Sequence, residues 1–96
     1  MEYERFENAQ ITNVTIRKCE RGGIETVVSL DFGPGGGQCI SCYNNFDLVK
    51  KLFEVTGCRD LNDCNKKYIR VKSSGINAGT KILAIGHIVK DIWKEI

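Results

Sequence analysis

Four cysteines in two pairs constrain this chain more than any other feature of its sequence. Cys39 and Cys42 form a C-x2-C pair directly after a glycine run, and Cys58 and Cys64 form a C-x5-C pair after an apolar segment. Zinc takes four soft ligands in a tetrahedron, and small domains often supply them from two separate chain segments. The spacing therefore predicts a structural Zn²⁺ site with all four thiolates as ligands.

Three other interpretations of these cysteines stay open. Buried thiols behave as small hydrophobic side chains. A redox C-x-x-C pair begins a helix, whereas Cys39 and Cys42 stand between Gly37 and Tyr43 in a strand or its turn. Structural disulfides belong to oxidising compartments, and nothing in the sequence indicates export. Cys19 lies on a different segment and is predicted to be a free thiol.

A chain of this length has a small core, so a bound metal would add substantially to its folding free energy. Residues 1–96 form one domain with a modest core, and residues 1–8 are predicted to be a tether. The net stability of such a domain is on the order of 0.1 kcal/mol per residue. A structural zinc contributes about 10–16 kcal/mol of apparent binding energy. The acidic N-terminus is unlike a signal peptide, and no apolar run reaches membrane-spanning length, so we expect a cytoplasmic protein.

The net charge of the chain does not indicate a class of binding partner. The net charge is +2, although the halves differ: residues 1–48 carry −3 and residues 49–96 carry +5. A strongly basic nucleic-acid binder has a higher isoelectric point. A protein that imitates DNA is frankly acidic.

Periodicity predicts an α+β fold. Alternating branched residues predict strands at 9–19, 24–32, 66–72 and 81–89, and residues 38–40 are strand-like. The alternation slips near Asn13, which indicates a bulge. Apolar residues at helical spacing predict a helix over 46–56, capped by Asn44 or Asn45 and ended by Gly57. A short helical turn follows at 59–64, and 73–79 is predicted to be a loop. The expected architecture is a mostly antiparallel sheet of about five strands with one main helix, stapled by zinc.

Catalysis is not expected. His87 is the only histidine, and its neighbours are strand residues. It is predicted to be a packed or exposed side chain, with replacement of one cysteine at zinc as the alternative. Four thiolates also complete the zinc shell and leave no open position for a substrate. We therefore expect a protein that is not an enzyme.

Two segments could bind a ligand or partner. The run Gly33–Gly37 lacks the Gly-Lys-Ser/Thr and the following helix that phosphate loops need, so it is predicted to be a plain turn. Tyr68, Arg70 and Lys72 should share the outward face of their strand. That face is either simply solvated or a docking patch with Tyr68 as an aromatic anchor.

Several short motifs give the chain a resemblance. It resembles small proteins of phages and prophages of low-GC Gram-positive bacteria, and within them the type II-A anti-CRISPR proteins of streptococcal phages. The motifs that carry the resemblance are Ile-Thr-x-Val (11–14), Leu-Asp-Phe-Gly (30–33), Gly-Gly-Gly-Gln (35–38), Phe-Glu-Val-Thr-Gly (53–57), Lys-Lys-Tyr-Ile-Arg-Val-Lys (66–72) and Ile-Gly-His-Ile-Val-Lys-Asp-Ile-Trp (85–93). Relatives of this kind carry a longer insertion after the position of Tyr43, and glycines or aliphatic residues where the four paired cysteines stand.

The resemblance implies a partner. It implies a phage-encoded inhibitor that binds the host type II RNA-guided effector nuclease stoichiometrically, through protein–protein contact in the bacterial cytoplasm. Two alternatives stay open. One is a small nucleic-acid-binding module that uses the basic C-terminal half. The other is a sponge for a cyclic nucleotide immune signal that uses the glycine run and the basic strand.

Overall fold

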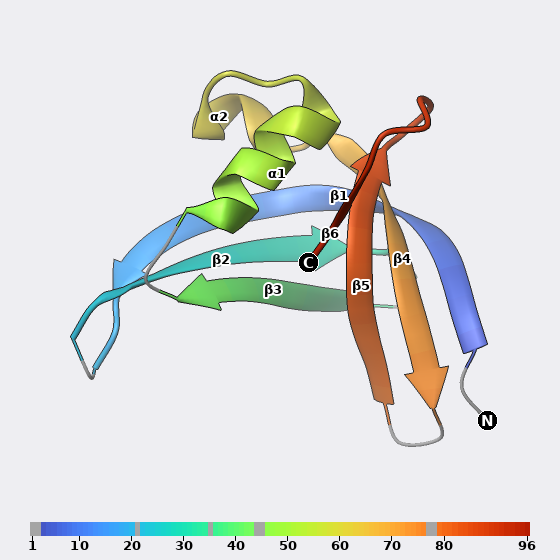
Figure 1. The fold of residues 1–96 in the computed structure, drawn as a ribbon, viewed down its shortest axis with the longest axis horizontal. Helices are drawn as coiled ribbons and strands as arrows, with labels where there is room; N and C mark the ends of the chain where they lie inside the picture. Colours follow the sequence, from blue (N-terminus) through green and yellow to red (C-terminus); the bar gives the residue numbers. More distant parts are fainter. Residues whose placement is uncertain (1–2, 21, 35, 44–45, 77–78) are drawn as a thin grey trace.

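One antiparallel sheet with a helical layer on one face makes up the fold (Figure 1). The computed structural model describes residues 3–20, 22–34, 36–43, 46–76 and 79–96. Within these residues the sheet has six strands in the order β3-β2-β1-β4-β5-β6. The elements are β1 (Tyr3–Lys18), β2 (Ile24–Asp31), β3 (Gly37–Tyr43), α1 (Asp47–Thr56), α2 (Leu61–Cys64), β4 (Tyr68–Ile76), β5 (Gly79–His87) and β6 (Trp93–Glu95). The predicted α+β class is confirmed, with one more strand than expected.

The long strand β1 joins the two halves of the sheet. Its first half pairs with β4, from Tyr3↔Gly75 to Gln10↔Tyr68, and its second half pairs with β2. The register with β2 shifts between Ile11 and Asn13, which confirms the predicted bulge. Figure 1 shows the two halves turned steeply against each other, with β1 running through both.

Helix α1 covers the sheet with the stripe that the sequence predicts. Its buried residues are Leu48, Val49, Leu52 and Val55, and three of them pack against the strand residues of the core. Gly57 ends the helix with φ 75°, a left-handed conformation that glycine adopts without strain. Phe46 precedes the helix without a side-chain cap, and the predicted caps Asn44 and Asn45 lie outside the described residues.

The core lies between α1 and the sheet. Side chains from five strands and both helices meet there, and α2 contributes the buried Cys64. Because side chains alternate along a strand, β1, β2 and β4 place every second residue in this layer, whereas β5 contributes Ile82 and Ile85, which flank a register shift with β4. The buried members are Ala9, Ile11, Val28, Leu30, Ile40, Leu48, Leu52, Val55, Cys64, Ile69, Val71, Ile82 and Ile85.

Three segments differ from the sequence prediction. Residues 3–8, expected to be a tether, form the paired first half of β1. Residues 73–76, expected to be part of a loop, continue β4 in register with β5. The C-terminal residues 93–95 add the sixth strand, at the edge of β5. In each case pairing with a distant strand supplies the order that local composition does not show.

The helices give no sign of a membrane segment. In the part of the chain that the structure describes, none of them has the length and apolar character needed to cross a bilayer.

Truncating the most deeply buried side chain of the α1 stripe tests this packing. Leu52 is fully buried, so we expect Leu52→Ala to lower the free energy of unfolding by about 2–5 kcal/mol. The control is Lys50→Ala on the exposed face of α1, which we expect to change it by less than about 0.5 kcal/mol. Urea unfolding followed by circular dichroism measures both. Equal values for the two variants would show that α1 does not pack on the sheet.

Candidate functional site

Strand β3 separates the first cysteine pair. Cys39 is exposed, whereas Cys42 is half-buried and packs against the core. The buried Ile40 lies between them and marks the side of β3 that faces α1. Residues three apart in an extended strand point to opposite faces. The two thiols that were expected to turn toward one ion therefore lie on opposite sides of the sheet.

The second cysteine pair lies at the junction of α1 and α2. Cys58 follows Gly57 and donates a hydrogen bond from its thiol to the carbonyl oxygen of Asp63 at 3.4 Å. Cys64 is fully buried in the core, and this burial raises the pKa of its thiol to about 11. The protonated thiol is therefore the form present at neutral pH. Cys64 acts as a small hydrophobic side chain here.

The four cysteines do not surround one point. Among the described residues no group of three or more His, Cys, Asp or Glu side chains is placed to hold a metal. The observed geometry thus does not fit a tetrahedral site made by Cys39, Cys42, Cys58 and Cys64. The cause is the extended conformation of β3, which a C-x2-C ligand pair would have to abandon.

His87 has a structural partner. Its ring Nδ1 accepts hydrogen bonds from the backbone N–H groups of Val89 at 3.0 Å and Lys90 at 2.9 Å. These bonds close the turn between β5 and β6. Nδ1 is therefore engaged by the backbone of this turn, and among the described residues no cluster of metal-ligating side chains includes His87.

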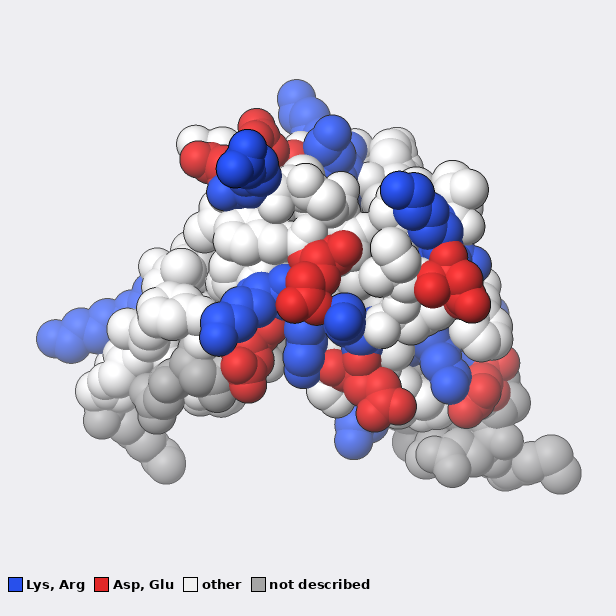
Figure 2. Space-filling view, turned by 45° about the horizontal axis from the view of Figure 1, so that its top comes forward, with Lys and Arg blue, Asp and Glu red and all other residues white. Residues whose placement is uncertain are grey.

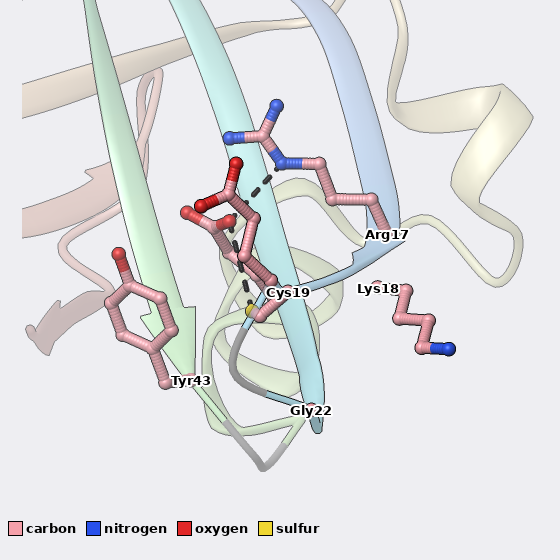
Figure 3. Close-up of a pocket in the computed structure, with 7 residues that line it drawn as sticks. Arg17, Lys18, Cys19, Gly22 and Tyr43 are labelled. Atoms are coloured by element: carbon pink, nitrogen blue, oxygen red, sulfur yellow. Dashed lines mark hydrogen bonds and ion pairs between the residues drawn. The ribbon is translucent and has the colours of Figure 1, made fainter.

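Cys19 lies in an open pocket beside the turn between β1 and β2 (Figure 3). Its thiol lies 3.9 Å from a carboxylate oxygen of Glu25, which also pairs with Arg17 Nε at 3.1 Å. Glu25 raises the pKa of Arg17, first through this hydrogen bond and then through its charge. The pocket holds about 740 Å³, and its described lining mixes both signs of charge. This lining selects no class of ligand.

The glycine run and the basic strand line different pockets. Gly33 and Gly36 have positive φ and form the turn between β2 and β3, while Gly35 lies outside the described residues. This turn borders a small pocket of about 270 Å³ together with Arg5 and Ser73. The basic residues that precede β4 line a separate pocket, with a volume of about 510 Å³. The two segments thus border separate cavities.

The outward face of β4 is as the sequence predicts. Ile69 and Val71 are fully buried toward α1, so Tyr68, Arg70 and Lys72 point to the opposite face. Tyr68 is 57% exposed. Lys72 Nζ lies 3.5 Å from a carboxylate oxygen of Glu4 on β1.

Two aromatic residues that the sequence did not single out join this face. Trp93 on β6 pairs with Gly86 on β5, which in turn pairs with Arg70. The Arg70 guanidinium lies 4.8 Å from the centre of the Trp93 ring, and Phe6 contacts the same ring edge-on at 5.6 Å. The pairing of β1 with β4 and of β5 with β6 brings them together, which no local sequence signal shows.

Hydrogen bonds and a glycine hold this arrangement. Arg70 donates to the carbonyl oxygens of His87 and Lys90, each at 2.7 Å. A Cβ on Gly86 would lie 2.7 Å from the Trp93 ring. Only glycine therefore lets the indole lie flat across β5. Arg70 and Trp93 are thus fixed in place before any partner arrives.

We name this surface the aromatic face and define it by Phe6, Tyr68, Arg70, Lys72 and Trp93. Figure 2 shows basic and acidic side chains interspersed over the described part of the face in view, rather than gathered in one large patch of a single sign. The aromatic face has aromatic surface and fixed cations in a small area. These are groups that protein-binding surfaces favour.

The reactivity of the thiols tests the cysteine geometry. In metal-free buffer at neutral pH we expect iodoacetamide to modify the exposed Cys39 first and the buried Cys64 last, because only accessible thiolates react. Mass spectrometry of digested samples taken over time gives the order. Repeating the reaction with added zinc is the comparison. Joint protection of Cys39, Cys42, Cys58 and Cys64, with one zinc per chain by native mass spectrometry, would contradict the arrangement described above.

The single tryptophan reports on the aromatic face. We expect Gly86→Ala to displace the Trp93 ring, with a loss of about 1–3 kcal/mol in stability from overpacking. Trp93 is the only tryptophan of the chain, so a shift in its emission spectrum measures the displacement directly. Phe46→Ala, remote on the helical layer, should leave the emission unchanged. An unaltered spectrum for Gly86→Ala would mean that the indole does not cover Gly86.

Comparison with known proteins adds no family to this geometry. The chain matches no family model, no curated protein and no solved structure. Its function must therefore be inferred from the chemistry of its own surface.

Proposed function

We propose that the chain is a binding protein that acts without turnover and docks a partner protein on its aromatic face. The observation that supports this most directly is the exposure of two aromatic side chains beside a fixed arginine. Phe6 is 62% exposed and Tyr68 57% exposed, and Arg70 lies on the same face. Tryptophan, tyrosine and arginine dominate the binding energy of protein interfaces.

Rigidity favours the same role. Phe6 and Tyr68 extend from paired strands rather than loops, and Arg70 is held by two backbone carbonyl oxygens. Side chains that are already ordered lose little conformational entropy on binding. The aromatic face can therefore bind a rigid partner surface without first being organised.

The resemblance to type II-A anti-CRISPR proteins supplies the candidate partner, the host RNA-guided effector nuclease. The chain would inhibit it stoichiometrically in the bacterial cytoplasm, either by occluding a nucleic-acid channel or by blocking a domain movement that cleavage requires. The near-neutral net charge of +2 favours a specific contact patch over imitation of DNA along the whole surface. A zinc ion held by Cys39, Cys42, Cys58 and Cys64 is not part of this proposal.

A single-stranded nucleic acid is the second candidate for the same face. Exposed aromatic rings stack on bases, and neighbouring cations contact phosphates. Two contacts disfavour it: Lys72 is paired with Glu4, and Arg70 is engaged with backbone carbonyls and Trp93. Fewer cations of this face are thus available to phosphates than the sequence suggests.

Tyrosine truncation tests the docking surface. We expect the wild-type chain to co-elute with the purified effector nuclease, and Tyr68→Ala to weaken the affinity at least about tenfold, as for an interface hot spot. The matched control is Phe46→Ala, an aromatic residue 48% exposed on the other side of the sheet, which should bind like the wild type. Biolayer interferometry measures the affinities.

Two results would redirect this proposal. If wild type and nuclease do not form a complex, the partner is wrong. If Tyr68→Ala and Phe46→Ala bind equally well, the face is wrong. Fluorescence anisotropy with a labelled single strand tests the second candidate, because nucleic-acid binding falls steeply as salt rises. Strong, salt-sensitive binding that Tyr68→Ala abolishes would favour the nucleic-acid role.

A further inference from the structure

One edge of the sheet is long and open. β3 is the last strand in the sheet order and runs over seven residues, Gly37–Tyr43. No strand pairs with its outer side in the described ranges. Figure 1 shows it as the outermost strand of its half of the sheet. The opposite edge, β6, has only three residues and includes Lys94 and Glu95.

β3 lacks the features that protect edge strands. Soluble proteins guard such edges with charged side chains, proline, bulges or very short strands. The sequence of β3, Gly-Gln-Cys-Ile-Ser-Cys-Tyr, contains neither a charged residue nor a proline. Its pairing with β2 runs through seven consecutive residue pairs without a register shift, whereas the β1–β2 and β4–β5 pairs each contain one.

The alternation of hydrogen-bonded residue pairs between β2 and β3 shows which backbone groups of β3 face away from β2. The Phe32 N–H donates to the Gly36 carbonyl oxygen at 2.9 Å, at the turn end of the β2–β3 hairpin. Bonded and non-bonded residue pairs alternate along an antiparallel ladder. Cys39 and Ser41 therefore direct their backbone N–H and C=O groups away from β2. Their side chains are exposed on the face away from α1.

We infer that β3 pairs with β3 of a second copy of this chain, antiparallel and around a two-fold axis at Ile40. This inference is independent of the proposed partner. In this register Cys39 lies opposite Ser41 of the second copy, and their outward backbone groups meet in bonded pairs. The strand is neutral along its whole length, so self-pairing brings no like charges together.

Shape selects this register over neighbouring ones. Tyr43, 60% exposed, falls opposite Gly37 of the second copy. Gly37 has to be glycine, because a Cβ there would lie 2.8 Å from the carbonyl oxygen of Leu30. The Tyr43 ring of one copy thus covers the backbone at Gly37 of the other, and such aromatic cover stabilises glycine at the edge of a sheet. A second copy supplies this match without any other protein, because the same strand holds both residues.

A charge placed on the edge tests the pairing. Under reducing conditions we expect the wild type to reach twice the mass of one chain in sedimentation equilibrium as its concentration rises. Ser41→Lys should remain monomeric, because an edge lysine blocks strand pairing. The matched control is Asn8→Lys, which adds the same charge to an exposed position of the central strand β1 and should still dimerise. Circular dichroism confirms that both variants are folded.

Cross-linking tests the register. Ser41→Cys puts a thiol opposite Cys39 of the second copy, with Cα atoms about 5.5 Å apart, within disulfide range. We expect mild oxidation to give a covalent dimer for Ser41→Cys, and none for the double variant Ser41→Cys/Cys39→Ser. A wild type that stays monomeric at every concentration overturns the inference. A dimer that Ser41→Lys leaves intact also overturns it, because another surface would then be responsible.

Discussion

The alternation of side chains along extended strands is the constraint on which this structure depends. It places the apolar residues of β4 under α1 and turns Tyr68, Arg70 and Lys72 to the opposite side. The same rule sends Cys39 and Cys42 to different faces of β3. One geometric property of the backbone thus creates a candidate docking surface and disperses a candidate metal site.

Packing of buried side chains stabilises the part of the domain that the structure describes. A bent sheet, the ten-residue helix α1 and the short helix α2 enclose the core. Cys64 contributes to this core as a neutral, buried side chain. At least one thiol that the sequence predicts as a ligand, that of Cys64, therefore packs as an apolar side chain in the core. Hydrophobic burial of this kind is the principal stabilising term for a domain of this size.

Local signals predicted the elements well, and distant pairing explains what they missed. The helix stripe, the left-handed Gly57 and the bulge near Asn13 each follow from a few neighbouring residues.

Residues 3–8 are charged and resemble a tether, and their order comes from pairing with β4. Phe6 and Trp93 meet across two intervening strands, so no spacing rule could join them. The sequence indicated strand character at residues 38–40, but the ligand spacing favoured a convergent pair of thiols, which the extended backbone of β3 separates. The strands predicted at 9–19 and 81–89 lie inside the sheet, a placement that local sequence pattern does not show.

The course of β1 has a consequence for how the chain assembles. β1 is made before its partner strands and becomes a central strand, and its pairing with β4, from Tyr3↔Gly75 to Gln10↔Tyr68, must wait until β4 is made. The β1–β2–β3 meander can form from neighbouring segments, whereas the pairing of β1 with β4 can form only after β4 has been made. Contacts between such distant segments slow folding. Until then the N-terminal half of β1 remains an uncovered edge on the growing chain, where nascent molecules are most exposed to mispairing.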